Sequence, residues 1–166
     1  MTKSEIIELC GKTAREAQIR DDVCSRSLLI GLKAYFDIPD ELIRASTNLC
    51  GGAGASSGSC GTYTCGLLAV GWKYNATAEE ELADPAKFDL CQSKFMAFRD
   101  RYQQEFGTTL CPEIQKKVYG RSYIFTKPED CEIYFTIADH NVQCANIVER
   151  ATRLCAEFLL EDEDIQ

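Results

Sequence analysis

The chain has 166 residues, 45% of them hydrophobic and 27% charged, and this length suits one domain with its own hydrophobic core. Its formal net charge of −8 at pH 7 argues against nucleic acid and anionic membranes as partners, because no basic surface is available to neutralise phosphates. No stretch approaches the ~18 apolar residues of a membrane span, and the polar N-terminus lacks the apolar segment of a signal peptide, so we expect a cytoplasmic protein.

Apolar residues recur at helical spacing along most of the chain, which predicts an all-α fold, a single-domain bundle of about six helices over residues 1–166. Capping residues, prolines and glycines give the approximate bounds. In chain order, the expected helices cover residues 4–19, 22–36, 39–43, 59–74, 85–106, 111–119 and 142–160. Residues 120–140 are expected as short strands (122–125 and 132–135) or a packed loop, and residues 161–166 as a solvated acidic tail.

The most informative segment is 49–66, which places Cys50, Cys60 and Cys65 around a glycine-rich loop that runs into an expected helix. Glycines let the backbone turn sharply and bring N–H groups close to a ligand, and a helix start adds partial positive charge. Thiols in such surroundings tend toward thiolate, the form that binds metals and carries out redox chemistry. The glycines expected to contact a bound cofactor are Gly51, Gly52, Gly54 and Gly61.

Four cysteines from distant segments fall at or within the first turn of an expected helix. They are Cys24, Cys60, Cys111 and Cys144. Each such position favours a negative charge by roughly 0.3–1 kcal/mol, and the thiol pKa falls accordingly. Asp21 or Asp22 is the expected cap before Cys24, and Ser59 the expected cap before Cys60. We therefore expect these four sulfurs to converge on one metal centre, with Cys50 or Cys65 as substitutes.

The other cysteines and the single histidine are expected to lie outside this centre. Cys10, Cys91 and Cys155 fall in the middle of helices on apolar faces, which predicts ordinary core positions. His140, the only histidine, is expected as an exposed loop residue rather than as a ligand.

Ten cysteines in a reducing compartment favour metal binding or redox chemistry over a disulfide framework. The chain contains no Cys-x-x-Cys pair, so neither a thioredoxin-type site nor a zinc ribbon is indicated. The glycine-rich loop follows an expected helix rather than a strand and lacks the lysine of a P-loop, so nucleotide binding is not favoured.

The cysteine pattern resembles the family named for the motif C…GCAxxG…C…C, over about residues 22–160. Cys24 resembles the first cysteine of that motif, residues 51–54 and 60–66 its glycine loop and centre, and Cys111 and Cys144 its last two cysteines. Thr62 stands where alanine is usual in the family, and Cys65 where glycine is usual. The resemblance implies a small helical redox-active protein, and relatives that join this module to c-type haem segments suggest electron transfer through an iron–sulfur centre.

Three functions remain open on the sequence. The first is an iron–sulfur protein for electron transfer, with the helix-start cysteines as ligands. The second is metal-free thiol–disulfide chemistry with Cys60 attacking and Cys65 resolving, although residues five apart on one helix point about 140° apart. The third is a structural zinc module with four cysteine ligands. No acid–base pair points to an enzymatic reaction, and the partners we expect are a redox partner protein and a second copy of the chain.

Overall fold

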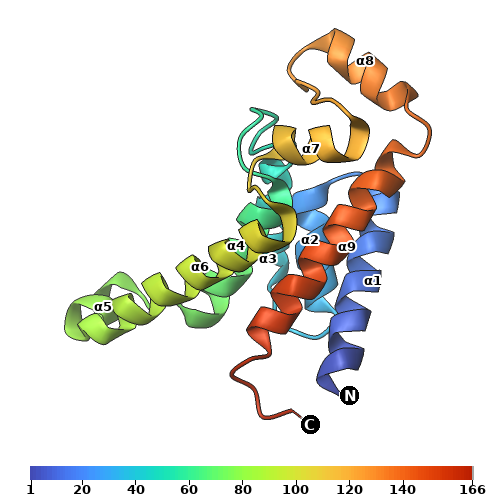
Figure 1. Cartoon of the computed structure of the whole chain (residues 1–166). Coiled ribbons are helices and arrows are strands. Elements are labelled where there is room, and N and C mark those ends of the chain that lie inside the picture. Colours follow the sequence, from blue (N-terminus) through green and yellow to red (C-terminus); the bar gives the residue numbers. More distant parts are fainter. Residues whose placement is uncertain (166) are drawn as a thin grey trace.

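The computed structural model describes residues 1–165 of the chain. Within that range there are α-helices, one short 3-10 helix and no strand, which confirms the predicted all-α fold (Figure 1). In chain order the elements are α1 (Lys3–Asp21), α2 (Cys24–Lys33), α3 (Asp40–Ser46), η1 (Thr47–Leu49), α4 (Gly61–Tyr74), α5 (Ala78–Ala83), α6 (Pro85–Phe106), α7 (Cys111–Tyr119), α8 (Pro128–Thr136) and α9 (His140–Leu159). None of these helices is long and apolar enough to cross a membrane.

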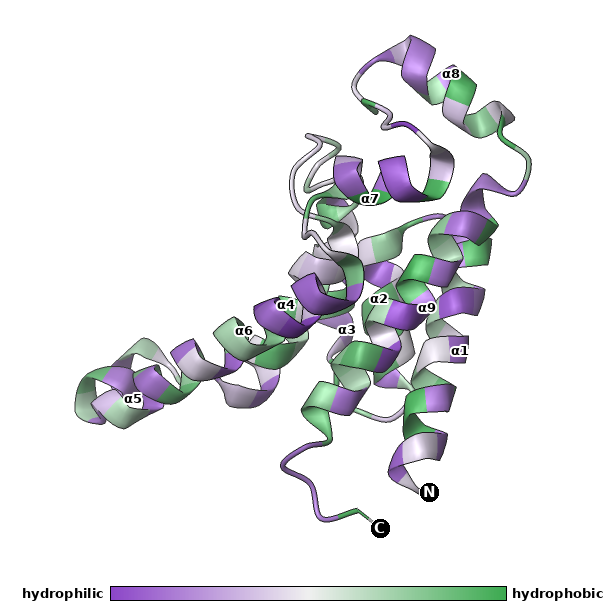
Figure 2. Cartoon of the chain, viewed as in Figure 1, coloured by the Kyte–Doolittle hydropathy of each residue, from purple (hydrophilic) through white to green (hydrophobic). Residues whose placement is uncertain are grey.

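The hydrophobic core lies between α1, α2, α4 and α9, and α6 packs across α4 and α9 (Figure 1). α1 and α9 run side by side and carry both hydrophobic and hydrophilic residues, as helices with one buried face do (Figure 2). Phe98 and Tyr102 of α6 and Phe158 of α9 are among the largest fully buried side chains. The Phe98 and Phe158 rings lie 5.6 Å apart in an edge-on arrangement, which ties α6 to α9.

Local signals explain the bounds of the long helix α6. Its N-cap Asp84 accepts a hydrogen bond from the Ala86 N–H, and Pro85 occupies its first position, where no backbone donor is needed. Gly107 ends the helix in a left-handed conformation with φ of 72°. The predicted range 85–106 is therefore confirmed.

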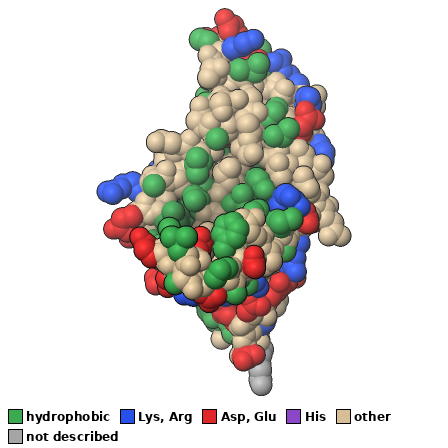
Figure 3. Space-filling view, turned by 90° about the vertical axis from the view of Figure 1, so that its left-hand side faces the viewer, with side chains coloured by type: hydrophobic (Ala, Val, Ile, Leu, Met, Phe, Trp, Pro, Cys, Tyr) green, Lys and Arg blue, Asp and Glu red, His purple; other side chains and the backbone are tan. Residues whose placement is uncertain are grey.

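The first half of α6 forms an arm with α5 that extends away from the bundle (Figure 1). Leu82, Phe88 and Leu90 of this arm are exposed, and Leu82 is 85% exposed. On the face shown in Figure 3, hydrophobic side chains accordingly lie among acidic ones. Cys91 belongs to the arm and is only half-buried, so the prediction that it lies in the core is wrong.

Residues 128–136 form helix α8, which differs from the strands or loop expected there. The sequence pattern was misleading because this segment is rich in aromatic residues, which are common in strands. The Tyr134 ring instead packs edge-on against Tyr119, Tyr123 and Phe125, at centroid distances of 5.0 to 5.6 Å. This aromatic cluster stabilises α8 as a helix above α7.

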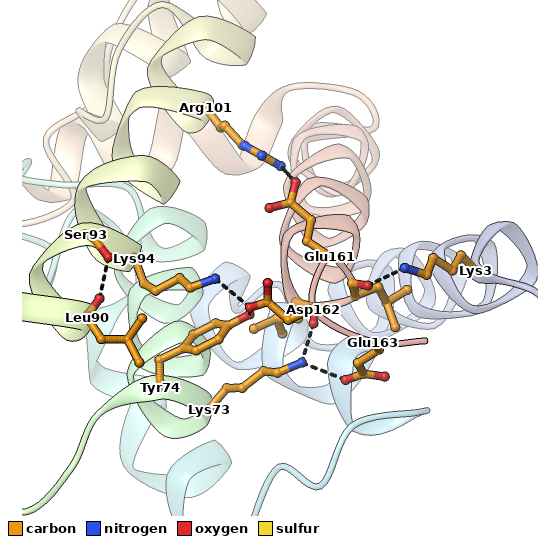
Figure 4. A network of polar contacts seen from close by, with 12 residues as sticks. Lys3, Lys73, Tyr74, Leu90, Ser93, Lys94, Arg101, Glu161, Asp162 and Glu163 are labelled. Carbon is orange, nitrogen blue, oxygen red and sulfur yellow. Dashed lines mark hydrogen bonds and ion pairs between the residues drawn. The ribbon is translucent and has the colours of Figure 1, made fainter. Parts of the chain in front are cut away.

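The acidic residues after α9 are largely exposed, as expected, and polar contacts also tie them to the bundle (Figure 4). Asp162 accepts hydrogen bonds from Tyr74 and Lys94, and Glu163 accepts one from Lys73. Arg101 forms an ion pair with Glu161. These contacts join the chain end to α4 and α6.

Candidate functional site

One end of the bundle contains a cavity of about 280 Å³ that is lined largely by apolar side chains and thiols. Six cysteines lie on its wall: Cys24, Cys50, Cys60, Cys111, Cys131 and Cys144. The four helix-start cysteines that the sequence singled out are therefore brought to the same cavity, although up to 120 residues separate them along the chain. Their role as ligands stays a prediction.

The helix starts differ from the predicted ones in detail. Asp22 ends α1 in a left-handed conformation, and Val23 rather than an aspartate is the N-cap of α2. Cys60 is itself the N-cap of α4, so Ser59 does not cap that helix. Cys111 is the first residue of α7, and Cys144 is the fifth residue of α9, just past the first turn in which it was expected. Cys24, Cys60 and Cys111 therefore lie at helix starts, where the helix dipole favours negative charge.

Backbone hydrogen bonds hold Cys60 next to Cys111. The Cys60 N–H donates to the Thr109 carbonyl at 2.7 Å, and the Cys111 N–H donates to the Gly58 carbonyl at 2.9 Å. Together these bonds form an isolated antiparallel bridge between residues 59 and 110. The end of the glycine loop is thereby fixed to the start of α7.

Cys24 and Cys60 shift each other's pKa in opposite directions. The hydrogen bond with Cys60 raises the pKa of Cys24 well above its usual value, and burial and the nearby Cys144 and Cys111 add to this effect. The same hydrogen bond lowers the pKa of Cys60 to about 6, against the effect of burial, and Thr62 and Tyr102 contribute to the lowering. Cys60 is therefore the thiolate of the pair.

The remaining helix-start thiols are neutral in the absence of a bound cation. Burial raises the pKa of Cys111 to about 12, and the negative charge of Cys60 adds to it. Burial also raises the pKa of Cys144, again with Cys60 as a second cause. Both thiols thus lie close enough to Cys60 to be affected by its charge. A metal cation would reverse this effect, because coordinated thiols lose their protons.

The glycine-rich loop forms a left-handed turn that satisfies its own N–H groups. Residues 51 to 55 all have positive φ angles, and the N–H groups of residues 53, 54, 55, 57 and 58 donate to carbonyls of residues 48 to 52. The start and the end of the loop approach each other closely at Gly52. A Cβ on Gly52 would lie 2.5 Å from the Gly58 nitrogen, so only glycine fits there. These N–H groups are used within the loop, contrary to the expectation that they face the sulfurs.

The four candidate glycines have different positions. Gly51 lines the cavity, whereas Gly52 and Gly54 shape the loop outside the lining. Gly61 lies under Cys24, and a Cβ on Gly61 would meet the Cys24 sulfur at 2.6 Å. Contact of any of them with a cofactor stays a prediction.

Cys131 on α8 is a cavity residue that the sequence reasoning missed. Its thiol donates to the Phe125 carbonyl at 3.2 Å, and it lines the cavity together with Tyr134 and Phe135. Pro128 opens α8 in the same way as Pro112 opens α7, so a helix-start signal was present before Cys131. The expectation of strands over this region hid that signal.

His140 is half-buried rather than exposed as expected. It is the first residue of α9, its Nε2 lies 3.5 Å from Asp22 Oδ2, and its ring packs against Tyr134 at 5.0 Å between centroids. Burial raises the pKa of the Asp22 carboxyl, while His140 and Gln18 oppose that rise. Asp22 thus brings a carboxylate to the cavity wall beside Cys24.

Three other cysteines lie in the hydrophobic core. Cys10, Cys65 and Cys155 are fully buried, which confirms the core positions predicted for Cys10 and Cys155. Burial raises the pKa of both Cys10 and Cys65 to about 12. Cys65 does not line the cavity, and the sulfur paired with Cys60 is that of Cys24.

Within residues 1–165, no three His, Cys, Asp or Glu side chains are grouped so that they could hold one metal ion in this conformation. The thiols instead surround the cavity from α2, α7, α8 and α9 and from the loop between η1 and α4. A single tetrahedral zinc ion needs four ligand atoms at about 2.0–2.3 Å from one point, whereas several metal ions in a cluster use more widely spaced thiolates.

The fold and the site define a small helical protein with a cysteine-lined cavity at one end of its bundle. A family model described as "Putative redox-active protein (C_GCAxxG_C_C)" matches residues 23–158. The chain belongs to this family. The search of curated proteins and the search of solved structures each gave no match.

Proposed function

We propose that this protein binds an iron–sulfur cluster through Cys24, Cys60, Cys111 and Cys144 and transfers electrons to a redox partner protein. The observation that carries the proposal is the convergence of these four cysteines, three from separate helices and one from the N-cap of a fourth, on one cavity. Membership of a family described as redox-active supports it.

The donor set fits such a group. Thiolates select iron–sulfur clusters, zinc or copper(I) among the metals that proteins use. A bound cluster would supply reversible one-electron chemistry. The apolar side chains of Ile114, Val118 and Ile147 line the same cavity and would limit access of water to it.

Each protein group has a separate task in this proposal. The four thiolates would hold the cluster, and the bridge between residues 59 and 110 would keep Cys60 and Cys111 in place. Cys50 and Cys131 line the same cavity and could replace one of the four as a ligand. Cys65 is left out because it is fully buried in the core.

A second candidate function is metal-free thiol–disulfide exchange, which is favoured by the position of Cys24 and Cys60 on one cavity wall and by the effect of each thiol on the pKa of the other. Oxidation would join the Cys60 thiolate to the Cys24 sulfur and release the one proton that Cys24 carries. The two electrons and this proton would reduce a disulfide of a partner protein to a thiol and a thiolate. This pair replaces the Cys60–Cys65 pair considered on the sequence.

The test is anaerobic purification followed by an absorption spectrum and the measurement of iron, acid-labile sulfide and zinc per chain. Iron and sulfide in equal amounts, with absorbance in the visible range, support the cluster. A colourless protein with one zinc per chain, or with no metal and one titratable disulfide, contradicts it, and the latter result supports the second candidate.

A further inference from the structure

Two hydroxyl groups connect the buried core to the sulfur of Cys60. The Tyr102 Oη lies 2.7 Å from the Thr62 Oγ1, and the Thr62 Oγ1 lies 3.2 Å from the Cys60 Sγ. Thr62 and Tyr102 are both 0% exposed. Water therefore cannot replace either hydrogen bond if one of the hydroxyl groups is removed.

The chemistry of sulfur fixes the direction of these hydrogen bonds. A thiolate or a metal-bound cysteine carries no hydrogen, so in either form Cys60 accepts and Thr62 donates. The single hydrogen of Thr62 is then used, and Tyr102 donates its own hydrogen to the Thr62 oxygen. The partly positive hydrogens of both hydroxyl groups thus point toward the sulfur, that of Thr62 directly and that of Tyr102 through the Thr62 oxygen.

Aromatic packing holds the Tyr102 hydroxyl in this position. Its ring lies 4.5 Å from that of Phe106 and 5.1 Å from that of Tyr63, measured between centroids. A ring held on two sides has little freedom to swing its hydroxyl away. The orientation of Thr62 is therefore set by the core of the bundle.

We propose that Thr62, oriented by Tyr102, is a positioning residue that sets the reduction potential of the Cys60 site. This inference rests on the proposed redox function and applies to both of its forms. A hydrogen bond to the sulfur stabilises the more negative, reduced state of a cluster, and it equally stabilises the reduced state of a dithiol. In both cases the bond raises the reduction potential.

The experiment measures the reduction potential of the couple that the purified protein carries, the cluster if it is coloured and the Cys24–Cys60 dithiol against glutathione otherwise. Thr62→Val keeps the shape of the side chain without its hydroxyl, and Tyr102→Phe removes the second hydroxyl. We expect each to shift the equilibrium about tenfold toward the oxidised form, which is about 30 mV for a two-electron dithiol couple. Thr62→Ser keeps the hydroxyl and should retain the wild-type potential.

The outcomes separate this inference from the proposed function. A wild-type protein without any redox couple overturns the proposed function and with it the inference. A wild-type couple whose potential is unchanged in Thr62→Val and Tyr102→Phe overturns the inference alone. A shift in Thr62→Ser as large as that in Thr62→Val also overturns it, because the effect would then come from packing. Circular dichroism establishes whether each variant is folded. If Thr62→Val does not fold, the potential of Tyr102→Phe provides the test.

Discussion

Gly61 lies so close to Cys24 that a Cβ on Gly61 would meet the Cys24 sulfur at 2.6 Å. The Leu49 carbonyl and the Ser25 Cβ would both lie at 3.1 Å, so the added atom has no free space to move into. The first residue of α4 is therefore a glycine because the start of α2 packs directly on it.

We expect Gly61→Ala to displace the Cys24 sulfur and to reduce the iron that the protein retains, while the helical circular dichroism stays near that of the wild type. The matched control is Gly71→Ala on the same helix, where the atoms nearest to the added Cβ all belong to the flexible side chain of Asn75. Alanine in a helix interior is favoured over glycine by about 1 kcal/mol, so this control should be folded and should retain the iron content of the wild type. Wild-type iron content in Gly61→Ala would show that the Cys24 position does not matter for the site.

The contacts of the C-terminal residues predict a pH-dependent contribution to stability. A hydrogen bond from Lys94, together with one from Tyr74, lowers the pKa of Asp162 below its usual value of 3.8. A carboxyl group with a lowered pKa stabilises the fold above its unfolded pKa and loses this contribution as the pH falls through its folded pKa. Lys94→Met should therefore lower the thermal unfolding midpoint at pH 7, and the difference from the wild type should shrink as the pH approaches 3.

The control for this prediction is Lys116→Met, which removes an exposed ion pair with Glu113 on α7. Lys116 is 53% exposed, against 20% for Lys94, and ion pairs in which both partners are exposed contribute little, so the midpoint of this control should stay close to that of the wild type. A difference for Lys94→Met that is the same at pH 7 and at pH 3 would rule out the ion pair as its cause.

The cysteines outside the cavity should differ in their contributions to stability. Cys10 is fully buried, so we expect Cys10→Ala to lower the free energy of unfolding by roughly 1–3 kcal/mol, through the lost contacts and the space left behind. Cys91 is half-buried on the arm, and Cys91→Ala should change the free energy of unfolding by less than about 0.5 kcal/mol. Urea unfolding of both variants provides the measurement, and equal losses would mean that Cys91 contacts more of the protein than this structure shows.

Elements with strong local signals could be predicted from the sequence. The bounds of α6 and α7 follow from Pro85 and Pro112 at their starts and from Gly107 and Gly120 at their ends. The position of Cys111 at the start of α7 could be predicted from Pro112 in the same way, whereas the meeting of four distant cysteines at one cavity depends on how the helices pack. These signals act within a few residues and need no tertiary contact.

Features that depend on contacts between distant segments could not be predicted in this way. Cys91 occupies an apolar stripe of α6, but the first half of this helix extends beyond the bundle. Helical periodicity does not indicate which part of a long helix packs on the core. α8 forms because Tyr134 packs into an aromatic cluster, which the strand-like composition of its sequence conceals. The pairing of Cys60 with Cys24 likewise depends on how α2 packs against α4.

The most direct test of the central claim compares two cysteines five residues apart, one in the cavity and one in the core. Cys60 lines the cavity, and Cys65 is fully buried away from it. Iron and acid-labile sulfide per chain are measured in Cys60→Ala and Cys65→Ala after anaerobic reconstitution with ferrous iron and sulfide. We predict that Cys65→Ala retains the wild-type iron content and that Cys60→Ala loses most of it. Wild-type iron content in Cys60→Ala, or an equal loss in a folded Cys65→Ala, would contradict the assignment of the redox centre to this cavity.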